Sequence, residues 1–317
     1  MVDWRAIAPW LAAMLLLVAT IIGAGIVGEA FAVDNPGTGD QRRTYHFEAA
    51  GQEMPYRLYV PSSYNGSKPY PLVVVLHGGG GDENGVFENS SLREVAEAKR
   101  VILVAPLGYS RFGGFGDIYP VMLSHAVAKA ATELKTRSGQ AGAADQPGAP
   151  ARPDEAAAPD DIVEVAASQL IEPRAGELSE QDVMTVLGRV RAEYRVDPRR
   201  IYLMGNSMGG IGTTYLAARY PEVWAAIAPS DGPIAAWSYP FARLRTHKVA
   251  ALFIHGEKDE HAHPKWSKAL ADAARDEGVD ARFLQVPGGS HAKAWTMVLP
   301  QTFDFFLAHT KPASSLK

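Results

Sequence analysis

A serine between glycines is the residue of this sequence best suited to nucleophilic chemistry. Ser207 lies in Gly205-Asn206-Ser207-Met208-Gly209, which fits the pattern G-x-S-x-G. Apolar residues 201–204 before it predict a strand, and residues 213–219 after it predict a helix. In that context the pattern is typical of a sharp strand-to-helix turn that exposes the serine oxygen, because the small residues let neighbouring backbones approach closely. We therefore expect Ser207 to act as a nucleophile.

An activated serine needs a base and a group that orients the base. On a parallel sheet with this turn, the expected chain order is serine, acid, histidine, each following a later strand. Asp259 follows the predicted strand 251–254, and His291 follows the predicted strand 282–286. We expect His291 to accept and return the serine proton, and Asp259 to orient its ring. Glu257 and Glu260 are the alternative acids.

A glycine-rich segment is suited to stabilising negative charge on a reacting oxygen. His77-Gly78-Gly79-Gly80-Gly81 follows the apolar run 72–76 and resembles the HGGG-type loop that supplies an oxyanion hole. The backbone N–H groups of Met208 and Gly79 are the expected donors, with Gly80 as a third candidate. His77 itself is expected to hold the loop rather than to act as the base.

These residues require a scaffold that brings strand ends together. Continuous apolar runs are typical of buried parallel strands, and they occur at residues 72–76, 101–105, 201–204, 251–254 and 282–286. Helical stretches between them predict an α/β fold with a mostly parallel sheet covered by helices on both faces. The clearest helix is predicted for residues 180–194, with Ser179 as its N-cap.

Composition excludes several classes of site. The 317 residues include no cysteine, so disulfides, thiolate metal sites and cysteine nucleophiles are excluded. A net charge of −4 without a run of basic residues argues against nucleic-acid binding. His255, His261 and His263 lack the spacing of a zinc-binding helix, and we interpret them as solvated loop residues. We expect no metal and no organic cofactor.

The N-terminal region has the character of a targeting segment. Residues 6–28 carry no charge, follow Arg5, and precede Ala30-Phe31-Ala32, a small-x-small pattern of the kind cut by signal peptidase. We interpret residues 1–32 as a signal peptide, which predicts a secreted or periplasmic protein. A retained membrane anchor, with the remaining chain outside the cytoplasm, is the alternative. The G-x-G-x-x-G pattern at 23–28 lies inside this segment and does not indicate a dinucleotide site.

One further segment departs from a globular pattern. Residues 138–159 contain 8 Ala, 4 Pro and 3 Gly among 22 residues, and so have little apolar surface to bury. We interpret this segment as a disordered insertion within a single domain of residues 33–317.

Together these motifs resemble the α/β-hydrolase superfamily. Within it they resemble secreted esterases related to polyhydroxybutyrate depolymerases and feruloyl esterases, and the prolyl-oligopeptidase-like peptidases. The resemblance rests on residues 76–81, 194–202, 205–210, 220–229, His255-Gly256 with Asp259, and Gly289-Ser290-His291.

The resemblance implies hydrolysis of a small-molecule or polymeric carboxylic ester through an acyl-serine intermediate, without a cofactor. Amide hydrolysis by a peptidase is the first alternative, and a non-catalytic binding module on the same fold is the second. Trp237, Tyr239 and Trp295 are candidates for lining a substrate pocket, with core packing as the alternative. The loop 111–116 is a further candidate for the rim of the site.

Overall fold

The computed structural model describes residues 37–88, 90–116, 174–232, 234 and 239–313. The predicted signal peptide, the predicted insertion at 138–159 and Trp237 lie outside these residues. Within the described ranges, no helix is both long enough and apolar enough to cross a membrane.

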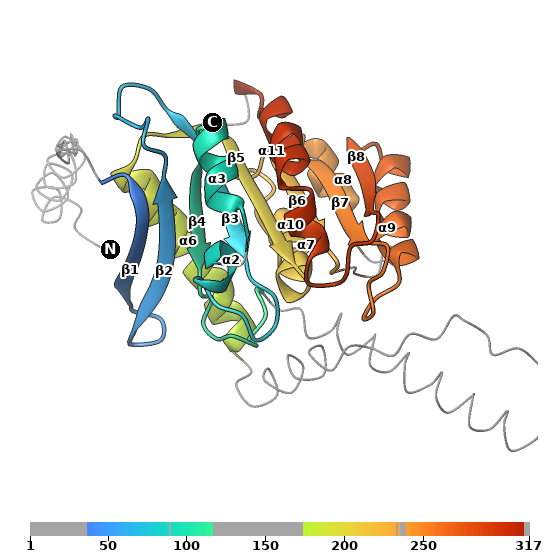
Figure 1. Ribbon diagram of the computed structural model, residues 1–317, viewed down its shortest axis with the longest axis horizontal. Helices are drawn as coiled ribbons and strands as arrows, with labels where there is room; N and C mark the ends of the chain where they lie inside the picture. The colour runs from blue at the N-terminus through green and yellow to red at the C-terminus, as the bar shows by residue number, and fades with distance from the viewer. Residues whose placement is uncertain (1–36, 89, 117–173, 233, 235–238, 314–317) are drawn as a thin grey trace, which may run out of the picture. The chain divides into compact units, whose positions relative to one another are not determined.

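One eight-stranded sheet organises the chain, with strand order β1-β2-β4-β3-β5-β6-β7-β8 (Figure 1). The strands β1 and β2 form an antiparallel hairpin at one edge, and β2 also pairs antiparallel with β4. All other neighbours are parallel, which confirms the predicted sheet type. The strands are β1 (Gly39–Phe47), β2 (Gln52–Val60), β3 (Tyr70–Leu76), β4 (Ile102–Pro106), β5 (Val196–Asn206), β6 (Ala226–Ser230), β7 (Ala250–Gly256) and β8 (Ala281–Val286).

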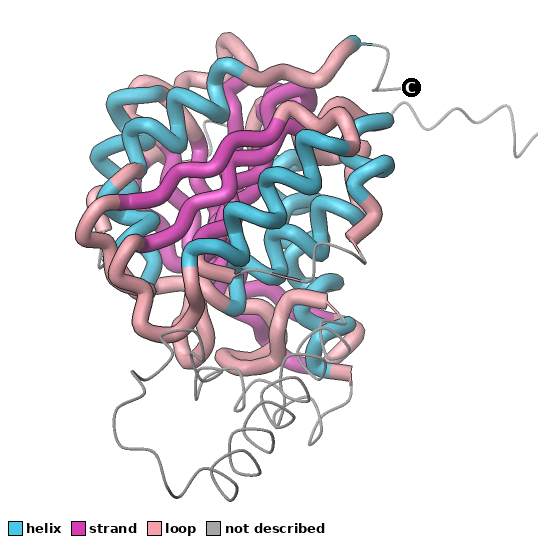
Figure 2. The backbone as a smooth tube through the Cα atoms, turned by 90° about the vertical axis from the view of Figure 1, so that its right-hand side faces the viewer, coloured by secondary structure: helices cyan, strands magenta, loops and turns pink. Residues whose placement is uncertain are grey.

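Helices cover both faces of the sheet. The described helices are α2 (Gly85–Glu88), α3 (Leu92–Lys99), α6 (Ala175–Glu193), α7 (Met208–Arg219), α8 (Phe241–Thr246), α9 (Pro264–Asp276), α10 (Ala294–Met297) and α11 (Leu299–Ala308). Buried side chains of α6 to α9 form one core with the sheet, and those of α2, α3, α10 and α11 form a second core on the other face. Figure 2 shows the strands between these two helical layers.

The central strand β3 is buried on both faces of the sheet, which explains why its sequence is apolar throughout. Leu72, Val74 and Leu76 belong to one core, whereas Val73 and Val75 belong to the other. Because successive side chains of a strand point to opposite faces, a strand between two helical layers must be apolar throughout.

The helix predicted for 180–194 begins earlier, at Ala175, and Arg174 stands at its N-cap position. The prediction that Ser179 caps this helix is wrong. Ser179 is buried inside α6, where its hydroxyl donates to the Ala175 carbonyl at 2.8 Å and accepts from the Tyr109 N–H at 3.0 Å. This serine therefore ties the segment after β4 to α6, a tertiary contact that local sequence does not reveal.

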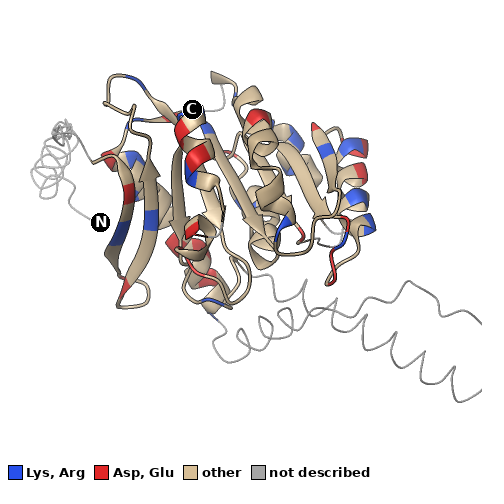
Figure 3. Ribbon diagram, viewed as in Figure 1, with Lys and Arg blue, Asp and Glu red and all other residues tan. Residues whose placement is uncertain are grey.

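Figure 3 shows acidic and basic residues interspersed along the helices and strands. The helix α9 is an example, since Lys268 and Arg275 both pair with Asp272.

Candidate active site

Ser207 lies between β5 and α7 at the carboxyl edge of the parallel strands. Its backbone has φ 55° and ψ −118°, a conformation that non-glycine residues rarely adopt. A Cβ on Gly205 would lie 2.5 Å from the Gly209 carbonyl oxygen, and one on Gly209 would lie 2.4 Å from the Leu76 carbonyl oxygen. Both glycines are therefore required for the turn, which is the physical reason for the G-x-S-x-G spacing.

The structure brings His291 to Ser207. The loop after β8 places the imidazole Nε2 at 2.8 Å from the Ser207 Oγ, and both residues are buried. On the other side of the ring, Nδ1 lies 2.9 Å from the Asp259 Oδ2. A ring with a carboxylate at Nδ1 has its proton there, which leaves Nε2 free to accept the serine proton.

Asp259 is held by donors on both carboxylate oxygens. Its Oδ1 accepts from the backbone N–H groups of His261 and Ala262, at 2.7 and 2.9 Å. Burial alone would raise the pKa of Asp259, but hydrogen bonds from His255 and His291 hold that pKa well below its usual range. The side chain is thus a buried carboxylate that stays ionised beside the imidazole.

The two alternative acids have other partners. Glu257 accepts from the Gly288 N–H at 2.8 Å, and Glu260 accepts from the backbone N–H of His291 at 3.3 Å. Of the three carboxylates, Asp259 is the one hydrogen-bonded to the imidazole of His291.

The glycine-rich loop lies beside the serine. A Cβ on Gly78 would lie 3.5 Å from the Ser207 Cβ, so the loop after β3 passes next to the reacting oxygen. Met208 is the first residue of α7, where a backbone N–H has no acceptor within the helix. These positions suit the predicted donors Met208 and Gly79.

The structure contradicts the prediction of Gly80 as a third donor of the oxyanion hole. Its N–H donates to the Arg111 carbonyl at 2.9 Å, so this group is already used in holding two loops together. The ring of Phe112 lies against the same glycine, 3.0 Å from the position of a Cβ there. The loop 111–116 is therefore packed on the glycine-rich loop.

His77 holds the start of that loop, as predicted. Its Nδ1 faces the Gly78 carbonyl at 2.7 Å, and its Nε2 faces the Leu107 carbonyl at 2.6 Å. Burial lowers the pKa of His77, and the hydrogen bonds to the Gly78 and Leu107 carbonyls oppose that shift.

Two of the predicted substrate-binding residues pack in or against the hydrophobic cores. Trp295 is buried in the core formed by α10 and α11 with the sheet. Tyr239 packs against Phe241 with ring centroids 4.6 Å apart, and its hydroxyl donates to the Thr214 carbonyl at 2.8 Å. Aromatic residues fill cores as readily as pockets, and the sequence offers no signal that separates the two uses.

The expectation that His255 is a solvated loop residue is wrong. It lies at the end of β7 with 0% exposure. His263, by contrast, is exposed and its Nδ1 accepts from the Lys265 N–H at the start of α9. His261 is half-buried, with its ring packed edge-on to that of His291.

The described residues contain one group that could offer three ligands to a metal. Oxygen or nitrogen atoms of Asp231, His255 and Asp259 lie within 4.8 Å of one another. Each of these residues is hydrogen-bonded within the protein, since Asp231 accepts from the Gly256 N–H and Asp259 accepts from two histidines. Hydrogen bonding therefore accounts for the short distances without an ion.

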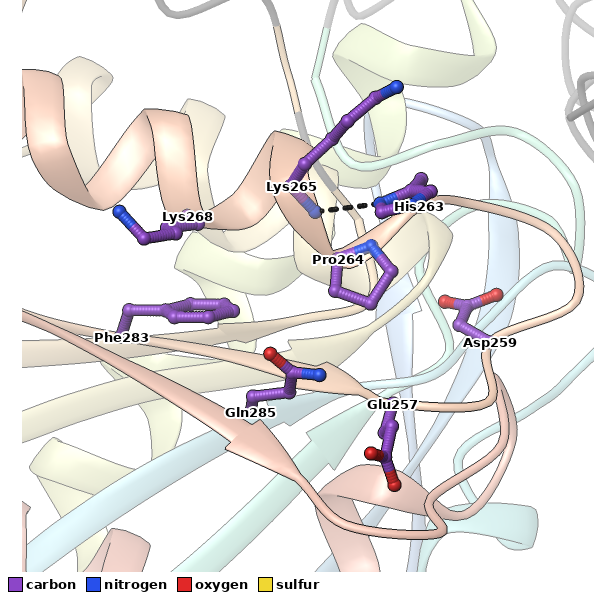
Figure 4. A pocket seen from close by; sticks show the side chains of 8 residues that line it. All are labelled: Glu257, Asp259, His263, Pro264, Lys265, Lys268, Phe283 and Gln285. Carbon is purple, nitrogen blue, oxygen red and sulfur yellow. Dashed lines mark hydrogen bonds between the residues drawn. The ribbon is translucent and has the colours of Figure 1, made fainter. Parts of the chain in front are cut away.

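A cavity of about 460 Å³ adjoins the Asp259 loop. Lys265 and Lys268 of α9 line one side, and Phe283 and Gln285 of β8 line the other (Figure 4). Its lining includes Asp259 but neither Ser207 nor His291. The sequence gives no sign of this cavity, because its walls come from two elements that are separate in the chain.

Comparisons with known proteins agree with this geometry. A model of the prolyl oligopeptidase family matches residues 168–243. Feruloyl esterase B of Neurospora crassa is 40% identical over 50 residues, which are 16% of this chain and 17% of that protein. Poly(3-hydroxyalkanoate) depolymerase C of Paucimonas lemoignei is 38% identical over 50 residues, which are 16% of this chain and 12% of that protein. The matched stretches thus span less than a fifth of either relative.

A solved structure extends the likeness over most of the chain. The fluorophosphonate-binding serine hydrolase FphF of Staphylococcus aureus has a TM-score of 0.58 at 14% identity, covering 86% of this chain and 99% of that one. A likeness at this identity is one of fold, and it coincides here with the parallel strand order and the turn at Ser207. The chain therefore has the α/β-hydrolase fold.

Proposed function

We propose that this protein is a serine hydrolase that cleaves carboxylic esters through an acyl-serine intermediate. The observation that carries the proposal is the continuous hydrogen-bonded chain from the Ser207 Oγ through His291 to Asp259. A serine, a base and an orienting acid in this arrangement are the components of nucleophilic acyl transfer.

In the proposed reaction the Ser207 Oγ attacks the ester carbonyl carbon while its proton moves to the His291 Nε2. Negative charge then develops on the carbonyl oxygen, and the N–H groups of Met208 and Gly79 donate to it. Collapse of this intermediate breaks the bond to the alcohol oxygen, which takes the proton from His291. Water, deprotonated by the same Nε2, then attacks the acyl-serine carbonyl carbon. The bond to the Ser207 Oγ breaks, Oγ takes the proton back from His291, and the carboxylic acid leaves.

Asp259 has an electrostatic and orienting role in this scheme. Its low pKa keeps it anionic throughout, so it stabilises the imidazolium that forms at each proton transfer. The proton stays on the imidazole rather than moving to the carboxylate.

The ester preference is supported by the similar proteins. The two relatives described above are a feruloyl esterase and a polyester depolymerase, so aryl and polymeric esters are the first substrates to test. The match to the prolyl oligopeptidase family at residues 168–243 supports peptide hydrolysis as the second candidate. Amides are the harder substrates, because the leaving nitrogen must be protonated as it departs.

We further propose that the protein acts outside the cytoplasm, either secreted, periplasmic or held by its N-terminal segment. The uncharged residues 6–28 and the Ala30-Phe31-Ala32 pattern support export.

The test compares p-nitrophenyl acetate, methyl ferulate and a p-nitroanilide peptide as substrates of the full chain and of Ser207→Ala. We expect ester turnover that disappears in the variant, and covalent labelling by a fluorophosphonate probe that also disappears. Turnover of the anilide alone would favour the peptidase. If none of the three substrates is hydrolysed and the probe does not label the protein, a non-catalytic binding module is the remaining interpretation.

A further inference from the structure

A second histidine lies behind the acid of the proposed active site. The His255 Nε2 is 2.9 Å from the Asp259 Oδ2, the same oxygen that accepts from His291. The opposite nitrogen, Nδ1, is 2.7 Å from the Ser267 Oγ of α9. A line of side chains therefore runs from Ser207 through His291, Asp259 and His255 to Ser267.

The surrounding acceptors determine which nitrogen of His255 carries the proton. Its Nε2 also lies 2.9 Å from the Ala262 carbonyl oxygen, and a carbonyl can only accept. Nε2 must therefore carry a hydrogen, which it donates to the Ala262 carbonyl, and the Asp259 Oδ2 also lies 2.9 Å from this nitrogen. In the neutral ring Nδ1 then accepts from the Ser267 hydroxyl, so Ser267 stabilises this tautomer.

The charged groups around the pair come from several elements. Asp231, after β6, lies 3.8 Å from the His255 Nε2, and burial raises the pKa of Asp231 to about 6. Glu260 and His261 flank His291 from the loop after β7. His255, Asp231 and the Asp259 carboxylate are fully buried, so hydrogen bonds among them act in a low-dielectric environment.

A second donor on one carboxylate oxygen has two physical effects. It fixes the plane of the carboxylate, because His261 and Ala262 hold Oδ1 while His255 and His291 hold Oδ2. It also draws electron density from Oδ2, which weakens that oxygen as an acceptor for the His291 proton.

We propose that His255 is a positioning residue for Asp259, with Ser267 selecting its tautomer, and that this pair limits the basicity of His291. The inference rests on the proposed hydrolase function, since His255 acts through Asp259 and touches no reacting atom. The sequence pattern predicts a solvated His255 and therefore does not indicate this role.

Two substitutions at His255 separate hydrogen bonding from packing. His255→Gln keeps an N–H close to the position of Nε2, whereas His255→Met fills the space without a donor. We expect His255→Met to lower kcat roughly ten- to hundredfold, as for a lost hydrogen bond to a charged group, and His255→Gln to restore most of it. Ser267→Ala should lower kcat less, in the same direction.

The pH profile supplies a readout that a merely structural role would not move. Without the His255 donor the Asp259 Oδ2 becomes a stronger acceptor and stabilises the His291 imidazolium. The acidic limb of kcat/KM should then move to higher pH by about one unit in His255→Met. Asp231 also has a raised pKa of about 6 and could contribute to the acidic limb. Asp231→Asn removes that carboxyl. The limb of the double variant Asp231→Asn/His255→Met should still lie at higher pH than the limb of Asp231→Asn alone.

The chain offers a matched control in His309, whose Nε2 lies 3.0 Å from the Asp280 Oδ2 at the opposite end of β8. His309→Met also removes a histidine–aspartate contact, and should leave kcat and the pH limb unchanged. An unshifted limb in a folded His255→Met protein, or a His255→Gln protein as slow as His255→Met, would overturn the proposal.

Nuclear magnetic resonance keeps this outcome separate from failure of the proposed function. The His291 Nδ1–H resonance and the ring titration can be followed without any substrate. A chain with no ester turnover whose His291 titration still moves upward in His255→Met would contradict the proposed ester hydrolysis and support the positioning role. Normal ester turnover with an unmoved His291 titration would do the reverse.

Discussion

The ring of His261 packs edge-on against the ring of His291, with centroids 4.6 Å apart and an interplanar angle of 66°. His261 follows Asp259 by two residues, and its backbone N–H donates to the Asp259 Oδ1. One short loop therefore supplies both the carboxylate that orients the His291 ring and an aromatic side chain that packs against its face.

This contact predicts that His261 limits the motion of the proposed base. His261→Ala should lower kcat by about two- to tenfold, in proportion to the value of an aromatic pair, while KM changes little. His261→Phe keeps the aromatic contact and should retain most of the rate. Steady-state kinetics on a p-nitrophenyl ester distinguish the two variants, and equal losses in both would show that packing is not the cause.

The choice of acid among three neighbouring carboxylates gives a second prediction. Asp259→Asn should lower kcat by about 10⁴-fold, because an amide leaves the His291 tautomer and the imidazolium unsupported. Glu257→Gln and Glu260→Gln should each change kcat far less, since their carboxylates accept from backbone N–H groups. A loss in Glu260→Gln comparable to that in Asp259→Asn would assign the orienting acid to Glu260.

The turn around Ser207 predicts that alanine is far more destabilising at Gly209 than at Gly188. Gly209→Ala would place a Cβ 2.4 Å from the Leu76 carbonyl oxygen, and we expect a loss of roughly 3 kcal/mol or more in the free energy of unfolding. Gly188→Ala is the control, because nothing lies within 4 Å of its Cβ on the exposed side of α6. The control should gain about 0.5–1 kcal/mol from helix propensity. Urea unfolding of both variants measures the difference.

A buried lysine predicts the stability of the fold at alkaline pH. Lys311 has 0% exposure, and its Nζ donates to the carbonyls of Pro221 and His247 at 2.8 and 2.9 Å. Burial lowers the pKa of Lys311 to about 8 from a usual value of 10.5. Between these two values the unfolded chain binds the additional proton, so this group makes the folded state more stable as pH rises from about 8 toward 10.5.

The measurement is the free energy of unfolding of the wild-type chain and of Lys311→Met between pH 7 and pH 10. The wild-type value should rise relative to that of the variant across this range, by up to roughly 3 kcal/mol for a shift of this size. Parallel curves for the two proteins would mean that the amine stays charged in the fold.

Much of this architecture is predictable from local pattern. The apolar run of β3, the alternation of strands and helices, and the glycines around Ser207 each reflect a physical requirement that acts within a few residues. Local pattern failed where the requirement was tertiary. Ser179 has the residue type of an N-cap, yet it lies inside α6 and accepts a hydrogen bond from the Tyr109 N–H.

The sequence predicts that Ser207, Asp259 and His291 each follow a different strand. Because parallel strands have their carboxyl ends at one edge of the sheet, the three residues are expected to lie close together. The sequence could not show that Gly80 donates to Arg111 or that His255 is buried behind Asp259. Nor could it show that Trp295 lies in a core and that the half-buried Tyr239 packs against one. Each of these depends on which element packs against a residue from across the fold. Residue type and spacing specify what a side chain can do, whereas its partners are set by contacts between segments that are distant in the chain.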